Sequence, residues 1–167
     1  KTCQTLEYVS KLNKSLLLLS KIDNSQFASV EKICLNEILY CYLDDYQEVY
    51  DYKGITLDVH EKNTFNITMN GTLAVVLITN LLKNAFVHNI YKGKIQIEIT
   101  SSNIRFGNTG KDEHLDEKHI FERFYQGSKK EGSTGLGLAI VDAICRQSQL
   151  SIQYQFVKGW HWFDISC

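Results

Sequence analysis

The spacing of apolar residues changes several times along this chain, and each change predicts a switch between helix and strand. Between residues 6 and 22, apolar side chains recur every three or four residues, which is typical of an amphipathic helix. Residues 95–99 and 104–106 instead alternate apolar and polar side chains, as half-buried strands do. The alternation of the two periods predicts an α/β fold, with helices layered on one face of a sheet and water on the other.

The same reasoning places the remaining elements. We expect strands at 27–34, 55–59 and 65–69, helices at 36–53, 73–87 and 135–146, and a last hairpin with strands at 151–157 and 161–165. Asn36 is the expected N-cap of the helix at 36–53, and Gly54 is its expected C-terminal stop. Asn70 and Gly71 mark a turn and the entry to the next helix.

Composition limits the functions that the chain can have. Its 167 residues, 44% of them hydrophobic and 22% charged, fit one folded domain or one domain with an appended element. The net charge of -1 argues against nucleic acid as a partner, because proteins that grip the phosphate backbone carry a basic face. Five scattered cysteines without a CxxC pair indicate reduced, mostly buried thiols in a cytoplasmic setting. We find neither an apolar run of membrane-spanning length nor a signal-peptide core.

One long segment, residues 109–134, follows neither period. It exceeds the ~12–15 residues beyond which a loop is usually functional or disordered. It is rich in charge and glycine, yet it contains Phe121, Phe124 and Tyr125, which would anchor it. The segment therefore predicts a mobile lid that is partly docked on the domain.

Two polar clusters precede the predicted lid or lie at its start. Asn80, Asn84 and His88 are four residues apart and so share one face of a helix. Their carbonyl and amide groups either hydrogen-bond to neighbouring loops or, as a functional alternative, meet a hard cation and phosphates. Asn108, inside the stretch 106–110 at the end of a strand, offers both a donor and an acceptor. That pair suits a base edge such as that of adenine, although an ordinary turn would also explain it.

A third cluster follows the predicted lid. At residues 132–141 a glycine-rich loop runs into an apolar helix, and the free N–H groups at a helix N-terminus bind phosphate well. The GK[ST] ending of a Walker A loop is missing, and the loop does not follow the first strand as a dinucleotide fingerprint would.

In combination and in this order, the clusters resemble the ATP-binding catalytic domain of sensor histidine kinases, in the ATPase superfamily shared with gyrase, HSP90 and MutL. The resemblance covers residues 27–167 and includes Ile-Phe-Glu-Arg-Phe-Tyr at 120–125 and Gly-Leu-Gly-Leu-Ala-Ile-Val at 135–141. Residues 1–26 are similar to the second helix of the dimerisation and histidine-phosphotransfer hairpin. The implied fold is a two-layer α/β sandwich of the Bergerat type, with a mixed, mainly antiparallel sheet, preceded by an amphipathic helix.

The resemblance implies ATP and Mg²⁺ as cofactors. Asn84 would be the Mg²⁺ ligand, with Asn80 beside it near the phosphates. Asn108 stands where the family usually has an aspartate that accepts a hydrogen bond from the adenine amino group. Arg123 would contact a phosphate or the partner helix. The other nucleotide-binding residues that the resemblance implies are His88, Gly110, Phe121, Tyr125, Thr134, Gly135, Leu136, Gly137 and Leu138.

The implied reaction is transfer of the γ-phosphoryl group to a histidine, for relay to the receiver domain of a response regulator. Gyrase-like relatives activate water with a glutamate where this chain has Asn80, which has no useful basicity, so we expect transfer rather than hydrolysis. The acceptor motif places a proline shortly after its histidine, and the chain has none; its histidines are His60, His88, His114, His119 and His161. We therefore expect a fragment that cannot phosphorylate itself. The implied parent is an inner-membrane receptor that forms a homodimer through its hairpin, with this part in the cytoplasm.

Three positions depart from the family pattern. Val87 replaces a frequent Lys or Arg, Gln126 replaces a frequent Arg, and Asp112 replaces a glycine. Because these changes remove positive charge and flexibility, we expect weaker nucleotide affinity than in a typical member. They also motivate an alternative, a non-enzymatic nucleotide-binding or pseudokinase regulatory module. A further alternative is a helical scaffold that dimerises through residues 6–19.

Overall fold

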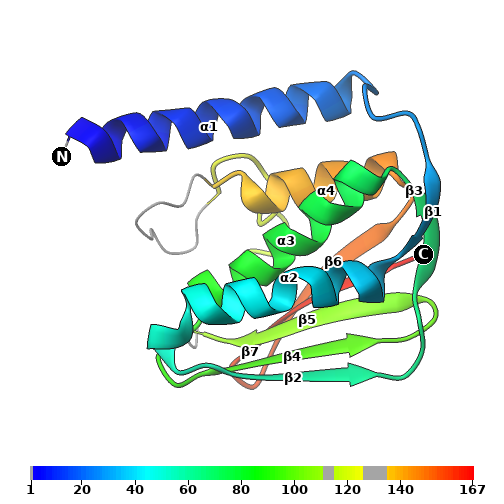
Figure 1. Cartoon of the computed structure of the whole chain (residues 1–167). Helices are drawn as coiled ribbons and strands as arrows, with labels where there is room; N and C mark the ends of the chain where they lie inside the picture. Colours follow the sequence, from blue (N-terminus) through cyan, green and yellow to red (C-terminus); the bar gives the residue numbers. More distant parts are fainter. Residues whose placement is uncertain (1, 111–114, 126–134) are drawn as a thin grey trace.

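The computed structural model describes residues 2–110, 115–125 and 135–167, and it confirms the alternation of helices and strands (Figure 1). The elements in chain order are α1 (Thr2–Asp23), β1 (Glu31–Cys34), α2 (Leu35–Val49), the 3₁₀ helix η1 (Asp51–Lys53), β2 (Thr56–Glu61), β3 (Asn66–Met69), α3 (Gly71–Val87), β4 (Lys94–Ile99), β5 (Asn103–Thr109), α4 (Gly137–Gln147), β6 (Ser151–Val157) and β7 (Trp160–Ser166).

The main sheet has the strand order β2-β4-β5-β7-β6. Strand β2 pairs with β4 in parallel, and the three other pairs are antiparallel, which confirms the mixed, mainly antiparallel sheet. The parallel pair needs a crossover, and α3 lies on the chain between its two strands. Strands β1 and β3 do not join this sheet. They form a separate two-stranded antiparallel sheet, so the expectation of a single sheet was incomplete.

Helices α2, α3 and α4 cover one face of the main sheet, as Figure 1 shows. The inward residues of β4 are Ile95, Ile97 and Ile99, and all three are fully buried, whereas the residues between them are not. Helix α3 lies in the middle of the helical layer and is apolar on most of its circumference, as the length of its apolar run indicated. Its buried residues are Leu73, Ala74, Leu77, Ile78, Leu81, Leu82, Ala85 and Phe86.

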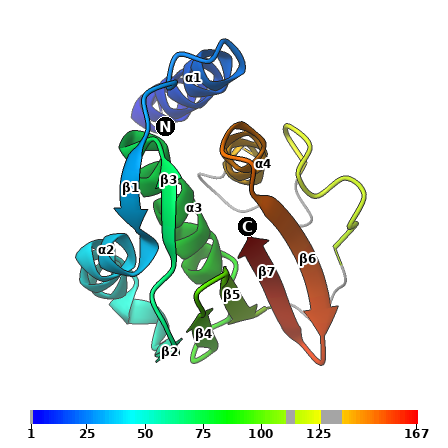
Figure 2. The same cartoon turned by 90° about the vertical axis from the view of Figure 1, so that its right-hand side faces the viewer.

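Helix α1 lies outside this layer, next to α4 (Figure 2). Near its C-terminus Leu19 and Ile22 are buried, whereas Leu6 is 64% exposed and Leu17 is 57% exposed. The apolar stripe is therefore covered at one end only, and the partner surface that the sequence predicts for the rest stays a prediction. Within the described ranges, no helix combines the length and hydropathy that crossing a bilayer requires.

Two predicted elements need correction. The strand expected at 27–34 occupies only its last four residues, 31–34. The helix expected at 36–53 starts at Leu35 and ends at Val49, and η1 follows it. Gly54, the expected C-terminal stop, is the C-cap of η1 and adopts φ 63°.

Asn36 is not the N-cap of α2, which is Cys34. Instead, Asn36 Nδ2 donates to the carbonyl oxygen of Asn63 at 3.0 Å, and its Oδ1 accepts from the N–H of Phe65 at 2.9 Å. The side chain thus ties the loop before β3 to the start of α2.

Asn70, at the predicted entry to this helix, is the N-cap of α3. Its side chain accepts a hydrogen bond from the N–H of Leu73 at 3.1 Å. Helix α3 begins at Gly71, slightly before the predicted start, and α4 begins at Gly137 rather than at 135. Thr109, the first residue of the predicted lid, belongs to β5.

Candidate functional site

The amide groups of α3 lie on one face of its C-terminal half, and each is partly buried. Asn80 Nδ2 donates to the carbonyl oxygen of Val76 at 2.8 Å, which leaves its Oδ1 to act as an acceptor. Asn84 lies one turn further on. His88 is the C-cap, and its N–H donates to the carbonyl oxygen of Asn84 at 3.1 Å. The predicted cluster therefore consists of two helical amides and a capping residue.

Gly137 brings the glycine-rich loop to this face. A Cβ atom built at Gly137 would lie 3.4 Å from Oδ1 of Asn80, so the first turn of α4 passes close to the α3 amides. Leu136, the N-cap, is fully buried and has no side-chain acceptor for the first N–H groups of α4. Gly135 adopts φ 73°, a left-handed backbone that favours glycine. An uncapped helix start beside two amides is suited to an anion and its counterion.

Gly110 brings the end of β5 to the same helix. A Cβ atom there would lie 3.0 Å from the carbonyl oxygen of His88 and 3.0 Å from Cδ2 of His161, so a larger residue would push these groups apart. The glycine is needed for close approach, as the sequence suggested. Asn84 lies between Asn80 and His88, and the helix face that carries it is thus bounded by α4 at one end and by β5 at the other.

Asn108 carries the clearest sign of a missing partner. Its side chain is 2% exposed, and its Nδ2 donates to the carbonyl oxygen of Thr109 at 3.0 Å. Its Oδ1 is buried and accepts no hydrogen bond from any described residue. A buried acceptor left without a donor costs about 1–3 kcal/mol. The site therefore favours a ligand that brings a hydrogen-bond donor to this oxygen, such as the exocyclic amino group of adenine.

Beside Asn108 lies a pair of residues that the sequence analysis did not assign to the site, His161 and Tyr154. His161 lies opposite Asn108 in the β5–β7 ladder, and its Nδ1 is 2.7 Å from the hydroxyl of Tyr154. Burial, as the main cause, raises the pKa of Tyr154 to about 12, so the hydroxyl stays protonated at neutral pH. The inward alternation of β7 could have indicated His161, because Phe163 and Ile165 in the same phase are core residues.

A further residue that the sequence analysis did not assign, Lys53, contacts the C-terminal end of α3. Lys53 is buried, and its Nζ donates to the carbonyl oxygens of Phe86, Val87 and Asn89 at 2.8, 3.0 and 3.4 Å. These carbonyl groups lie in and just after the last turn of α3, so the ammonium group stabilises the C-terminal end of the helix. The sequence analysis placed Lys53 at the end of a helix and gave no signal for this contact.

The predicted lid is only partly within the described residues; 111–114 and 126–134 lie outside them, and with them Thr134, Asp112 and Gln126. In the described part, Ile120 is buried and Phe121 makes an edge contact with Phe163 at 6.3 Å between ring centroids.

Tyr125 is partly buried against the hydrophobic core, and its hydroxyl accepts a hydrogen bond from the N–H of Asp116, within the same segment, at 3.0 Å. Docking by the Phe124 ring was predicted wrongly, because that ring is 55% exposed. Its backbone makes the contact instead: the N–H of Phe124, at φ 65°, donates to the carbonyl oxygen of Gly135 at 2.8 Å. The described contact of Arg123 is with α1 of the same chain, where Nη2 lies 3.0 Å from Oδ2 of Asp23.

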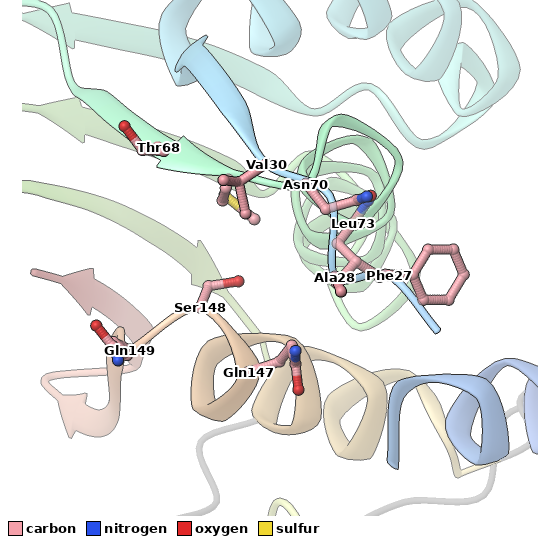
Figure 3. Close-up of a pocket in the computed structure, with 10 residues that line it drawn as sticks. Phe27, Ala28, Val30, Thr68, Asn70, Leu73, Gln147, Ser148 and Gln149 are labelled. Carbon is pink, nitrogen blue, oxygen red and sulfur yellow. The ribbon is translucent and has the colours of Figure 1, made fainter. Parts of the chain in front are cut away.

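A cavity of about 230 Å³ lies at the other end of α3 (Figure 3). It is lined by uncharged residues from the α1–β1 connection, the end of β3, the start of α3 and the end of α4, namely Phe27, Ala28, Val30, Thr68, Met69, Asn70, Leu73, Gln147, Ser148 and Gln149. None of the predicted nucleotide-binding residues lines it. This cavity is therefore separate from the amide face, as we name the face of α3 that carries Asn80, Asn84 and His88.

The donor set fits Mg²⁺ held together with a phosphate chain. Magnesium prefers oxygen ligands and usually takes only one or two from protein, with the rest from water and substrate phosphates. Among the described residues there is no group of three or more His, Cys, Asp or Glu side chains that could hold a metal ion. The amide oxygens of Asn80 and Asn84 are of the kind that could supply one or two protein ligands at this face.

The chain was compared with known proteins. A family model described as histidine kinase-, DNA gyrase B- and HSP90-like ATPase matches residues 69–161. The heme sensor protein HssS of Staphylococcus epidermidis is 33% identical over 141 residues, which make up 81% of this chain and 31% of HssS. HssS of Staphylococcus aureus strain Newman is 32% identical over 152 residues, 87% of this chain and 33% of HssS. The chain thus spans about a third of the length of these curated relatives.

Solved structures share the fold. The histidine kinase AdeS of Acinetobacter baumannii matches with a TM-score of 0.75 and 22% identity, over 96% of this chain and 78% of that one. The histidine kinase ThkA in complex with the response regulator protein TrrA matches with a TM-score of 0.73 and 19% identity, over 96% of this chain and 47% of that one. At these identities the likeness shows the two-layer α/β fold together with its preceding helix.

Proposed function

Because the chain belongs to the family of histidine kinase-, DNA gyrase B- and HSP90-like ATPases, we propose that it is the ATP-binding catalytic domain of a two-component sensor histidine kinase. It transfers the γ-phosphoryl group of ATP to a histidine outside the chain. The observation that carries the proposal is the buried, unpartnered Oδ1 of Asn108, placed on the strand that ends beside Gly110 and His88. That oxygen accepts a hydrogen bond from the adenine amino group.

In this proposal the nucleotide phosphates lie at the end of the amide face that is nearer to α4, away from Asn108. Gly135 and Gly137 let the backbone approach them, and the first N–H groups of α4 donate to their oxygens. Asn84, assisted by Asn80, would hold Mg²⁺, which would supply positive charge beside the phosphates. Asn80 contributes as an oriented amide, since its Nδ2 is held by Val76 and its Oδ1 is turned toward Gly137.

Transfer rather than hydrolysis follows from the residues of the amide face. A water molecule needs a general base for attack, and neither Asn80 nor Asn84 can accept a proton at neutral pH. The domain then acts by positioning the nucleotide and by electrostatic stabilisation, while the acceptor histidine supplies the nucleophile. The phosphoryl group passes next to a response regulator, a partner class supported by the ThkA complex with TrrA.

The parent protein is proposed to be a homodimeric membrane receptor whose dimerisation hairpin includes α1 and whose kinase part faces the cytoplasm. The sensor relatives and the exposed apolar residues Leu6 and Leu17 on α1 support this assignment. In it, residues 1–26 are the second hairpin helix and residues 27–167 are the catalytic domain.

Titration with Mg²⁺ and a non-hydrolysable ATP analogue tests nucleotide binding, and we expect saturation. The acceptor hairpin of the parent chain, added as a separate polypeptide with Mg²⁺ and labelled ATP, tests transfer. Label on a histidine of the hairpin supports the kinase, and an acid-labile, alkali-stable phosphate identifies that linkage. Saturable binding without transfer would instead support the pseudokinase alternative that the departures at Val87, Asp112 and Gln126 motivate. No saturation at millimolar analogue would refute a nucleotide site.

A further inference from the structure

An ion pair connects the end of α1 to the segment that precedes the glycine-rich loop. Arg123 Nη2 and Asp23 Oδ2 are 3.0 Å apart, although the residues are 100 positions apart in sequence. Asp23 is the last residue of α1, where the helix dipole already places partial negative charge. A cation from another part of the chain therefore stabilises this helix end twice, through the carboxylate and through the helix dipole.

Arg123 is held from the opposite side by contacts within residues 115–125. Ile120 is buried, and Phe121 packs against Phe163 of β7. Phe124, the residue after Arg123, adopts φ 65°, which is uncommon for a residue other than glycine and needs surrounding contacts to persist. Arg123 thus extends to α1 from a short turn that is anchored on the core.

The same turn contacts the glycine-rich loop directly. The N–H of Phe124 donates to the carbonyl oxygen of Gly135 at 2.8 Å, and Gly137, two residues on, lies so near α3 that an added Cβ atom would be 3.4 Å from Oδ1 of Asn80. A series of contacts therefore runs from Asp23 through Arg123 and Phe124 to Gly135, next to the close approach of α4 to the amide face of α3.

We propose that Arg123 is a positioning residue. Paired with Asp23, it fixes the contact between Phe124 and Gly135, and it thereby holds the glycine-rich loop in the conformation that receives the nucleotide phosphates. The proposal rests on the function proposed above. Nucleotide binding and the order of the α1 terminus then stabilise each other, because coupling between two sites is reciprocal. Both side chains of the pair are 49% exposed, so the coupling is modest, about two- to fivefold in affinity.

The variants R123Q and D23N, their double variant and the charge swap R123D/D23R test this coupling. The control is R146Q, because Arg146 makes a similar exposed ion pair, 3.1 Å from Asp142, within α4 and away from the loop. The measurements are the Kd for a Mg²⁺-bound non-hydrolysable ATP analogue and hydrogen exchange at residues 20–26 with and without that analogue.

We expect R123Q and D23N each to weaken binding about two- to fivefold, the double variant to weaken it no further, and the swap to restore it. In the wild-type chain the analogue slows exchange at residues 20–26, and in R123Q this protection is lost, which a purely structural role would not produce. R146Q keeps wild-type affinity. Additive losses, an unrestored swap or unchanged affinities overturn the coupling alone. A wild-type chain that does not bind the analogue overturns both the coupling and the proposed function.

Discussion

At its N-terminus α3 is capped by its neighbour in sequence, Asn70, whereas at its C-terminus it is capped by Lys53, which lies 33 residues before the first carbonyl that it contacts. The N-terminal end faces an uncharged cavity, and the C-terminal end carries the amide face and contacts Gly110 and Gly137. The comparison shows that the end stabilised by distant residues is the one that holds the candidate site. Its capping ammonium group comes from a distant part of the chain, whereas the cap acceptor at the other end comes from the residue next to the helix.

The largest expected effect is at the C-terminal end, from Asn84→Ala. Removing the amide oxygen takes away the proposed Mg²⁺ ligand, so Mg²⁺-dependent binding of an ATP analogue falls by at least about 100-fold. The midpoint of thermal unfolding changes little, because Asn84 is only partly buried. Isothermal titration and calorimetry measure the two quantities. Thr72→Ala, in the exposed first turn of the same helix, is the matched control. An unchanged affinity for Asn84→Ala would show that the ligand assignment is wrong.

Lys53→Met should produce the largest loss of stability. The variant keeps the length of the side chain but removes the ammonium group that donates to three carbonyl oxygens at the end of α3. Hydrogen bonds to charged groups contribute about 1.5–3 kcal/mol, so we expect a loss of about 2–3 kcal/mol in urea unfolding. Lys92→Met, at an exposed position nearby, should stay within about 0.5 kcal/mol of wild type. Equal effects of the two variants would remove the distinction between the two helix ends.

Asn108→Asp should change affinity and stability in opposite directions. A carboxylate accepts a stronger hydrogen bond than an amide, so ATP-analogue binding tightens by about fivefold. The fold loses about 1–3 kcal/mol, because the new oxygen cannot donate to the carbonyl oxygen of Thr109. The same variant assayed with a GTP analogue is the control, since a 6-oxo group offers no donor to the carboxylate. Lower stability without tighter ATP binding would place Asn108 outside the base pocket.

The smallest effect is expected at the N-terminal end, from Asn70→Ala. Loss of an N-cap typically costs about 1 kcal/mol, and the hydrogen bond from Asn70 Nδ2 to the carbonyl oxygen of Ser29 is lost with it. Nucleotide affinity should stay within about twofold of wild type, because no nucleotide-binding residue lies at that end. Asn70→Asp, which keeps the cap acceptor, should recover most of the stability. A large change in affinity would mean that the two helix ends are coupled.

Asn36 and Asn70 show how far local sequence can be read. Each was predicted to start a helix, and the prediction is confirmed for Asn70 alone. Strand β1 runs up to Cys34 and leaves Asn36 within the first turn of α2, where its side chain bonds Asn63 and Phe65 instead. Both positions have a residue suited to capping, and the difference arises from a loop nearly thirty residues away.

The candidate site divides in the same way. Asn80, Asn84, Asn108 and the glycines could be assigned from spacing and from the resemblance, because helix periodicity and motif order are properties of the chain itself. His161 was within reach of strand alternation, but its pairing with Tyr154 was not. The Arg123–Asp23 pair had no sequence signal beyond charge, since a contact across 100 residues depends on how α1 lies against α4.

By itself, the sequence determined the order and type of the elements, the amphipathic α1 and the residues that could meet a nucleotide, because local periodicity and side-chain chemistry act over a few residues. Only the tertiary structure decided that β1 and β3 form their own sheet, that Lys53 caps α3 and that Asn108 keeps a buried oxygen without a donor. Those features depend on which distant groups the packed layers bring within hydrogen-bond distance and which they keep from water.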